Sequence, residues 1–388
     1  MIGSNLQSIN AIIDTTSPFL WVREKILPEI KNSFAPSDST TYVNSKEEFK
    51  MKNIFGTIKG TLGKDNIILN NKNIPMIFGL IRELSLTDQN FDCAIGFGRI
   101  YDGIEYESKT LNESLSFLHQ MKNVKNMGNI IFSIEFSKDQ DNNYKSTLYL
   151  GAQHDVFEQF RDLTGFCNLR ESKEIYPYWG CRMSHIIFGE NTGVLFKQNS
   201  KEVYIEALFD TSTYEIRAPI YLLNVFLDKL NTEKDNCVSS ELGLFHKISC
   251  KKIEAIPEIS FVFNGYALSL SKSILYEHND NVFILKILFD KTTTYFHMGL
   301  IFFLDYHTLF HGEKKIMMFY NSVHEKIANI RAYTEDRDFF FNEHALDVSL
   351  ITIGTVFSLV LGAWILYRRH KKIKEKKALE EASLTKLI

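Results

Sequence analysis

Signatures of several common functional sites are missing from this chain of 388 residues. Its five cysteines form no C-x-x-C pair, which argues against a structural zinc site. The chain has no glycine-rich phosphate loop and no G-x-S-x-G turn, so neither nucleotide binding nor a serine nucleophile of that type is indicated. We therefore expect no metal and no cofactor.

Basic residues are outnumbered by acidic residues before the C-terminal tail. The residues after Tyr367 include eight of the 44 Lys and Arg but only three of the 47 Asp and Glu. The preceding body is therefore acidic, whereas binding to phosphates needs a basic face. We expect no nucleic-acid partner.

Aromatic residues, in contrast, are abundant, with 31 Phe and 17 Tyr, which indicates a β-rich core. Short apolar runs alternate with turn residues, as in an antiparallel protein with many strands. The length is sufficient for two domains with cores of their own, and we predict an all-β fold. The clearest strand candidates are residues 67–69, 129–136, 146–150, 203–209 and 259–263, and the helix candidates are 114–121 and 220–230.

One long uncharged run, VSLITIGTVFSLVLGAWILY, occupies residues 348–367. One helix of this length crosses a hydrocarbon core of ~30 Å. Trp364 and Tyr367 lie near one end, as rings in the headgroup layer do, and a basic cluster follows at once. The positive-inside rule predicts a single-pass membrane protein with a cytosolic tail and a luminal or extracellular body.

The N-terminal residues MIGSNLQSINAIID have neither the basic start nor the apolar core of an export signal. Either the sequence lacks its beginning, or a tail-anchored protein keeps its body in the cytosol. The charge rule favours the first alternative. The triplet Asn112-Glu-Ser114 is a glycosylation sequon, which suits a luminal loop.

The cysteines allow two economical disulfides in an oxidising compartment. These pair Cys237 with Cys250 and Cys167 with Cys181, the nearest neighbours in the sequence. Cys93 stands in an apolar run and is interpreted as a core residue. The alternative is that all five thiols are reduced and buried.

An internal repeat singles out two aspartates. Residues 11–17 read AIIDTTS and residues 207–213 read ALFDTST, so each apolar run ends in Asp-Thr, a small residue and a hydroxyl residue. Each half also carries a later apolar segment with a glycine, CAIGFG at 93–98 and HMGLIF at 297–302. One such turn is common at a strand end. Two in matching frames are much rarer by chance.

The repeated aspartates, Asp14 and Asp210, have a defined chemistry if they meet. Two adjacent carboxyls cannot both ionise easily, so they share one proton and act as an acid and a base at the same pH. The base activates a water and the acid protonates a substrate carbonyl. Such a pair hydrolyses peptide bonds without a metal or a covalent intermediate.

The sequence resembles the pepsin-like (A1) aspartic proteases over roughly residues 2 to 320. The similarity consists of nine segments in the family's order, and no single one is decisive. The segments are IIDTTSPFLWV at 12–22, FAPSDSTTY at 34–42, FGTIKGTLGKDNIIL at 55–69, FDCAIGFG at 91–98, LYLGAQH at 148–154, YPYWGCRMSHIIFG at 176–189, ALFDTSTYEIRAP at 207–219, IPEISFVFNG at 256–265 and MGLIFFLDYHTLF at 298–310.

The resemblance implies roles for the residues of the two Asp turns. The two aspartates would be the catalytic dyad. Thr15 and Thr211 would bond each active loop to the other lobe. Ser17 and Thr213 would bond the outer carboxylate oxygens.

The resemblance also implies a flap that closes over the substrate. Phe55 would occupy the flap-tip position, with Gly56 and Thr57 next to it, and Trp21 would lie behind the flap. The family has Tyr where this chain has Phe55, so the ring is kept and the hydroxyl is lost.

Three further positions depart from the family pattern. Thr16 and Ser212 stand where the family has glycine after each Asp-Thr, and Leu300 replaces the Asp of a C-terminal Leu-Gly-Asp motif. A β-carbon in place of glycine could crowd or tilt the carboxyls. A misplacement of ~1 Å can cost ~100-fold in rate.

The predicted architecture is a bilobal pepsin-like fold with a C-terminal transmembrane helix. Residues 1–160 would form the N-terminal β lobe with the flap, 161–320 the C-terminal β lobe, 321–347 a stalk, 348–367 the membrane helix and 368–388 the basic cytosolic tail.

The predicted function is that of a membrane-anchored aspartic endopeptidase, a monomer acting on peptide or protein substrates. An alternative is a pseudo-protease that binds peptides or partners in the same cleft without cleaving them. A third is an adhesion or scaffolding ectodomain, which requires the cleft to be closed.

Overall fold

The computed structural model places most of the body of the chain. The chain divides into two compact units, Met1–Tyr333 and Thr334–Ile388. The predicted membrane helix and basic tail belong to the second unit and lie outside the described residues. In the described part, no helix combines the length and apolarity needed to cross a membrane. The residues described are 1–25, 33–53, 56–84, 92–100, 111–124, 127–138, 144–151, 165–170, 178–189, 192–195, 197–198, 201–202, 204–233, 236–321 and 330–332.

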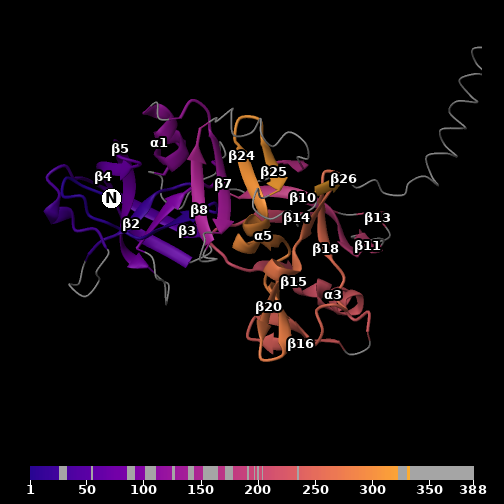
Figure 1. Ribbon diagram of the computed structural model, residues 1–388. Coiled ribbons are helices and arrows are strands. Elements are labelled where there is room, and N and C mark those ends of the chain that lie inside the picture. The colour runs from indigo at the N-terminus through magenta and orange to yellow at the C-terminus, as the bar shows by residue number, and fades with distance from the viewer. Residues whose placement is uncertain are drawn as a thin grey trace, which may run out of the picture. The chain divides into compact units, whose positions relative to one another are not determined.

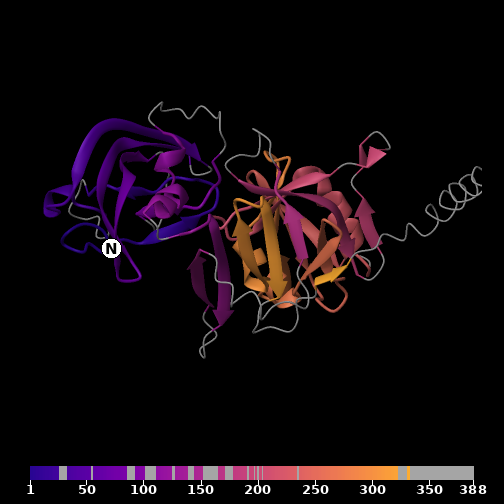
Figure 2. The ribbon, with the colours of Figure 1, turned by 90° about the horizontal axis from the view of Figure 1, so that it is seen from above.

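The N-terminal part of the chain forms a six-stranded sheet, drawn in indigo in Figures 1 and 2, with the order β1-β6-β2-β5-β4-β3. Its long strands β3, β4 and β5 pair antiparallel in sequence order, while the short β1 runs parallel to β6. The carboxyl ends of β1 and β6 therefore meet at one edge. The strands are β1 (Ala11–Asp14), β2 (Trp21–Arg23), β3 (Val43–Asn53), β4 (Gly56–Leu69), β5 (Lys72–Leu84) and β6 (Cys93–Gly96).

A larger sheet of 13 described strands follows, with the central order β15-β23-β14-β10-β18. Here too a short strand, β14, runs parallel to a later one, β23. The strands are β10 (Trp179–Phe188), β11 (Thr192–Leu195), β14 (Ile205–Phe209), β15 (Ile216–Pro219), β16 (Cys237–Leu242), β17 (Phe245–Cys250), β18 (Ile259–Phe263), β19 (Tyr266–Leu270), β20 (Tyr276–Asn279), β21 (Val282–Leu285), β22 (Ile287–Asp290), β23 (Phe296–Met298) and β26 (Ile330–Ala332).

A third sheet combines strands from both halves of the sequence, in the order β8-β7-β24-β25-β9 (Figure 1). It joins β7 to β24, so the chain's two halves share this layer. Its strands are β7 (Ile131–Lys138), β8 (Tyr144–Leu150), β9 (Gly165–Asn168), β24 (Tyr306–His311) and β25 (Ile316–Asn321). A separate ribbon consists of β12 (Lys197–Gln198) and β13 (Lys201–Glu202).

Helices are short and few among the described residues. Residues 220–230, predicted as one helix, begin with a 3₁₀ turn and continue as α3. The helices are η1 (Pro36–Asp38), η2 (Glu113–Leu115), α1 (Phe117–Asn123), η3 (Ile220–Leu222), α3 (Leu223–Leu230), α4 (Lys272–Leu275) and α5 (Leu300–Asp305). Strands dominate the described residues, which confirms the all-β prediction and is consistent with the bilobal pepsin fold.

Tight turns explain how so many strands reverse over short distances. Asn70 and Asn71 connect β4 to β5 with φ of 47° and 61°, and Asn264 and Gly265 connect β18 to β19 with φ of 49° and 80°. Positive φ at both central residues suits the two-residue hairpin turn whose twist matches the flanking strands. Asn and Gly tolerate this backbone conformation better than other residues.

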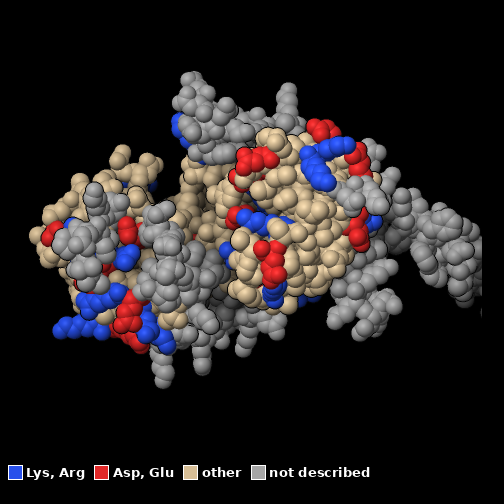
Figure 3. All heavy atoms as spheres, turned by 90° about the horizontal axis from the view of Figure 1, so that it is seen from below, with Lys and Arg blue, Asp and Glu red and all other residues tan. Residues whose placement is uncertain are grey.

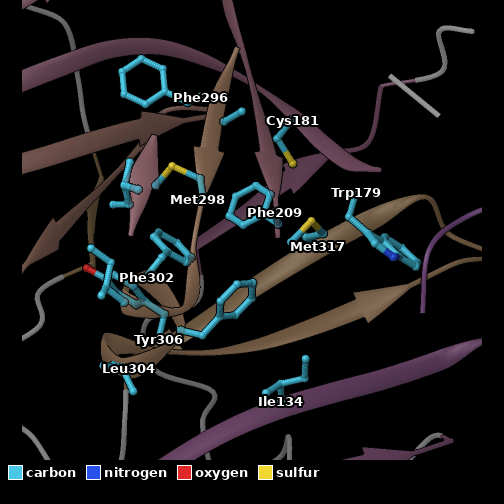
Figure 4. Close-up of a cluster of buried hydrophobic side chains, with 14 of the residues drawn as sticks. Ile134, Trp179, Cys181, Phe209, Phe296, Met298, Phe302, Leu304, Tyr306 and Met317 are labelled. Carbon is cyan, nitrogen blue, oxygen red and sulfur yellow. The ribbon is translucent and has the colours of Figure 1, made fainter. Parts of the chain in front are cut away.

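The core beneath the second Asp turn is aromatic (Figure 4). Phe209, the last residue of β14, packs against Phe302 and Phe319 with ring centroids 5.2 and 5.4 Å apart. Trp179 donates its indole N–H to the carbonyl oxygen of Phe97 at 2.7 Å, which connects β10 to the residue that follows β6. These fully buried side chains fix the strand end that carries Asp210.

On the face shown in Figure 3, small groups of basic and acidic side chains lie side by side within larger areas of other residues. Several exposed charges form ion pairs across strands, such as Lys59 with Glu83 at 3.2 Å. Such exposed pairs contribute ~1 kcal/mol at most. Stability must therefore come mainly from the buried core.

Candidate active site

The two aspartates of the repeat lie at equivalent strand ends. Asp14 is the last residue of β1 and is paired with Gly96 of β6, while Asp210 directly follows β14. The Asp14 carbonyl oxygen accepts from Phe97 N–H at 2.7 Å, and the Asp210 N–H donates to the Met298 carbonyl oxygen at 3.0 Å. Both aspartates are 0% exposed. Each carboxyl thus stands at the edge where two parallel strands end.

Two threonine hydroxyls join the Asp turns to each other. Thr15 Oγ1 donates to the carbonyl oxygen of Phe209 at 2.8 Å and accepts from the Thr211 N–H at 3.0 Å. Reciprocally, Thr211 Oγ1 donates to the carbonyl oxygen of Ile13 at 2.6 Å and accepts from the Thr15 N–H at 3.3 Å. Each turn is therefore held against the backbone that carries the other aspartate.

The residues in place of glycine contact the carboxyls directly. Asp14 Oδ1 accepts from the N–H of Thr16 at 2.8 Å and from its hydroxyl at 2.6 Å. Asp210 Oδ1 accepts from the N–H of Ser212 at 2.8 Å and also from the Ser212 hydroxyl. The β-carbons that could have crowded the carboxyls instead carry hydroxyls that orient them.

The hydroxyls of Ser17 and Thr213 do not make the bonds to the outer carboxylate oxygens that the resemblance implied, although the backbone N–H of Ser17 helps to lower the pKa of Asp14. Ser17 Oγ donates to the sulfur of Met51 at 3.8 Å, and Thr213 Oγ1 is buried without a hydrogen-bond partner among the described residues. The reason is local geometry. In each turn the N–H two residues after the aspartate points at Oδ1, and a hydroxyl on that same residue reaches the same oxygen.

The outer oxygens of the two carboxyls remain available. Oδ2 of Asp14 and Oδ2 of Asp210 are both buried and accept no hydrogen bond from the described residues. Burial raises the pKa of Asp14 to about 7. The Thr16 hydroxyl opposes this shift, and the charge of Asp210 adds to it. The charge of Asp210 therefore disfavours the ionised form of Asp14, as expected for two carboxyls of one site.

Sequence reasoning missed a histidine beside Asp210. His297 lies on β23, and its Nδ1 is 4.0 Å from Asp210 Oδ2. Its ring faces the Tyr178 ring edge-on at a centroid distance of 6.4 Å. Burial raises the pKa of Tyr178 to about 12, and the charges of Asp210 and Asp14 add to this effect. Aligning Gly96 of the first apolar segment (93–98) with Gly299 of the second (297–302) would have placed His297 beside the strand that leads to Asp210.

The predicted flap region is described in part. Strand β3 ends at Asn53 and β4 begins at Gly56, which are paired, and Thr57 pairs with Lys52. Phe55 lies outside the described residues. Trp21 is fully buried in β2, in a cluster that also contains Phe19, Phe49, Met51 and Ile58.

The cysteines form the two economical pairs. The structure joins Cys167 to Cys181, and Cys237 to Cys250, which lie directly opposite each other on β16 and β17. Cys93 is a buried free thiol, and burial raises its pKa to about 12. Within the described ranges, no group of three or more His, Cys, Asp or Glu side chains is arranged to hold a metal ion.

Comparisons with known proteins agree with this geometry. The family model "Eukaryotic aspartyl protease" matches residues 1–319. Pepsin B of Canis lupus familiaris is 24% identical over 323 residues, which cover 80% of this chain and 76% of that protein. Pepsin II-2/3 of Oryctolagus cuniculus is 26% identical, with 72% and 68% covered, and Plasmepsin I of Plasmodium falciparum is 25% identical, with 73% and 62% covered. The chain belongs to the eukaryotic aspartyl protease family.

Proposed function

We propose that this protein is an aspartic endopeptidase in which Asp14 and Asp210 activate water and hydrolyse peptide bonds. The observation that carries the proposal is the pair of Asp turns, locked together by Thr15 and Thr211, with one unbonded Oδ2 on each carboxyl. One carboxyl takes a proton from a water molecule as the water oxygen attacks the peptide carbonyl carbon. The other donates its proton to the carbonyl oxygen, so the tetrahedral intermediate carries no full negative charge.

The family and the strands around the site support a peptide or protein as the substrate of this proposed activity. In this proposal, an extended peptide binds between two β lobes, and the β3–β4 hairpin closes over it. Gly56 and Thr57 at the start of β4, and Trp21 on β2 behind this hairpin, would then contact or support the bound chain. Closure would exclude water from the dyad.

The test incubates the purified full chain with a denatured protein between pH 3 and pH 6. We expect cleavage that a pepstatin-type inhibitor blocks. Asp14→Asn and Asp210→Asn should each lower kcat/KM by roughly 10⁴-fold or more, because the two groups act as one unit. Asp228→Asn, at an exposed position of α3, is the matched control and should leave the rate unchanged. Cleavage that persists in both dyad variants would refute the proposal.

A second candidate, a pseudo-protease, is favoured by one specific observation. Both carboxyls are 0% exposed, so a peptide must displace neighbouring atoms to reach them. In that case the same cleft would bind a peptide or a protein partner without hydrolysis. Saturable binding of a pepstatin-type inhibitor by a chain that cleaves no substrate between pH 3 and pH 6 would favour this candidate.

We also propose that residues 348–367 anchor a monomeric protein in a membrane, with the body on the luminal or extracellular side. The support is the length of the apolar run and the basic cluster after it. The full chain should resist alkaline extraction from membranes, and a chain that ends at Asp347 should be released. Asn112 is exposed, so a luminal body should show a glycosidase-sensitive mobility shift that Asn112→Gln removes. Release of the full chain from membranes at alkaline pH would contradict the proposal that residues 348–367 are a membrane anchor.

A further inference from the structure

The two halves of the site differ at one equivalent position. In the first half, Ala94 of β6 is paired with Ile12, two residues before Asp14. In the second half, His297 of β23 is paired with Leu208, two residues before Asp210. Both lie two residues before the glycine of their apolar segment, Gly96 or Gly299. The duplicated scaffold therefore presents a methyl group beside one carboxyl and an imidazole beside the other.

The imidazole is oriented toward the unbonded oxygen of its carboxyl. His297 Nδ1 is 4.0 Å from Asp210 Oδ2, and the His297 side chain is 15% exposed. This distance is in the range of an ion pair and exceeds that of a direct hydrogen bond. In contrast, the causes that shift the pKa of Asp14 include no basic side chain from the part of the chain that the structure describes.

The groups around His297 determine when it is charged. Arg217 on β15 is directly opposite it on one side, and Asp210 follows β14 on the other. Tyr178 faces the ring, and Asp290 on β22 adds a negative charge nearby. Burial lowers the pKa of His297, the charge of Asp210 raises it, Arg217 lowers it and Asp290 raises it. The imidazole is therefore neutral at neutral pH and gains its proton in acid, where Asp210 can pair with it.

We propose that His297 is a positioning residue that breaks the symmetry of the dyad, so that Asp210 is the carboxylate base and Asp14 carries the shared proton. An imidazolium 4.0 Å from Oδ2 attracts a negative charge on that oxygen. Asp14 has no such neighbour among the described residues, and burial raises its pKa, so it keeps its proton. This inference rests on the proposed function, because it assigns the two roles that peptide hydrolysis requires.

With these roles assigned, each proton transfer of peptide hydrolysis has a defined donor and acceptor. The attacking water gives a proton to Asp210 Oδ2 while the water oxygen bonds to the carbonyl carbon. Asp14 Oδ2 gives its proton to the carbonyl oxygen. On collapse, the carbon–nitrogen bond breaks, the leaving nitrogen takes the proton from Asp210, and Asp14 regains a proton from one hydroxyl of the intermediate. A carboxylic acid and an amine are released, and the dyad returns to its starting state.

The first experiment does not depend on catalysis. The His297 ring is followed by NMR in the full chain with labelled histidine, and its signal is assigned by its loss in His297→Gln. Asp210→Asn should lower the pKa of His297 by about one unit or more, whereas Asp14→Asn should change it much less. Equal shifts in the two variants, or no shift in either, would overturn the proposal. This readout stays informative if the chain cleaves nothing, so failure of the proposed function is distinguishable from failure of this inference.

The second experiment uses the pH profile of kcat/KM. His297→Ala, which restores the residue found at the equivalent position of the first half, should move the acid limb to higher pH by about one unit. Activity near the wild-type acid limb should therefore fall about tenfold, with a smaller loss at higher pH. His278→Ala, at an exposed histidine on β20, is the control. A uniform loss at every pH, with the acid limb unmoved, would assign His297 a purely structural role and refute the proposal.

Discussion

The Asp14 turn and the Asp210 turn have the same hydrogen bonds and different surroundings. In both, the residue two positions after the aspartate donates an N–H and a hydroxyl to Oδ1. In both, the threonine next to the aspartate donates its hydroxyl to the opposite turn. The backbone of the site is thus symmetric.

The surroundings break that symmetry. Near Asp14, Ser17 donates to the sulfur of Met51, and the cluster behind it is apolar. Near Asp210 lies His297, with Arg217 on the adjoining strand, while the Tyr178 hydroxyl is influenced by both carboxyls. Backbone repetition therefore sets the geometry of the pair, and the side chains around each turn set its charge. A duplicated scaffold can in this way produce two carboxyls with different chemistry.

The largest expected effect concerns the dependence of folding stability on pH. Folded Asp14 holds its proton up to a pKa of about 7, while the unfolded chain releases it near 3.8. Between these values the folded state binds more protons, so stability falls as pH rises from about 4 to about 7 and is constant above. A shift of about three pKa units corresponds to ~4 kcal/mol. Urea unfolding of the full chain at pH 4 and pH 7 measures this loss.

Asp14→Asn should remove most of that pH dependence, because amides do not titrate. Asp228→Asn, on the surface of α3, should retain it. An unchanged slope in Asp14→Asn would show that other groups cause the effect, and the proposed difference between the two carboxyls would lose its thermodynamic support.

The next largest effect tests the symmetry of the backbone. A β-carbon at Gly96 would lie 2.4 Å from backbone atoms of Phe19, and one at Gly299 would lie 2.1 Å from the carbonyl oxygen of Glu215. Phe19 and Glu215 each stand five residues after their aspartate. Gly96→Ala and Gly299→Ala should each destabilise the fold by ~3 kcal/mol, because backbone atoms cannot move aside.

Gly128→Ala is the control for these two substitutions, since a β-carbon there would meet nothing within 4 Å. Denaturant midpoints of the three variants give the comparison. If only one of Gly96→Ala and Gly299→Ala is destabilised, the two strand-end packings are not equivalent.

A smaller effect is expected from the crossing threonines. Thr15→Val and Thr211→Val each leave a carbonyl and an N–H at buried or part-buried positions without their partner, at a cost of ~2 kcal/mol. Because the two hydroxyls contact each other at 3.4 Å, the double variant should lose less than the sum. Thr15→Ser and Thr211→Ser keep the hydroxyl and should be near wild type. Additive losses in the double variant would mean that the two turns are held independently.

The sequence predicted both Asp turns and many of the strands, and the features that it did not predict have physical reasons. The Asp-Thr repeat located both turns, and alternating apolar runs located strands such as β7, which begins at Ile131 where residue 129 was predicted. Ser17 and Thr213 were predicted to bond the outer carboxylate oxygens, whereas the hydroxyls that reach the carboxylates belong to Thr16 and Ser212 and bond Oδ1. Which hydroxyl reaches a carboxylate depends on turn dihedrals that residue type alone does not specify.

His297 was missed for a different reason. Its position beside Asp210 results from the parallel pairing of β14 with β23, two strands that are distant in the sequence. Local patterns do not report such a contact. A structural repeat does report such a contact, because each residue in one half then predicts where its equivalent lies in the other half.

The smallest expected effect separates the two carboxyls by their own hydroxyl donors. The hydroxyl of Thr16 lowers the pKa of Asp14, so Thr16→Gly should raise that pKa by up to about one unit, the value of one hydrogen bond to a carboxylate. If Asp14 is the acid, the basic limb of kcat/KM then moves to higher pH. Ser212→Gly removes the corresponding donor from Asp210, the base, and should move the acid limb instead. Thr16→Ser keeps the hydroxyl and should leave both limbs in place. Movement of the same limb in both glycine variants would show that the carboxyls exchange roles freely, so that the different surroundings of the two turns have no consequence for catalysis.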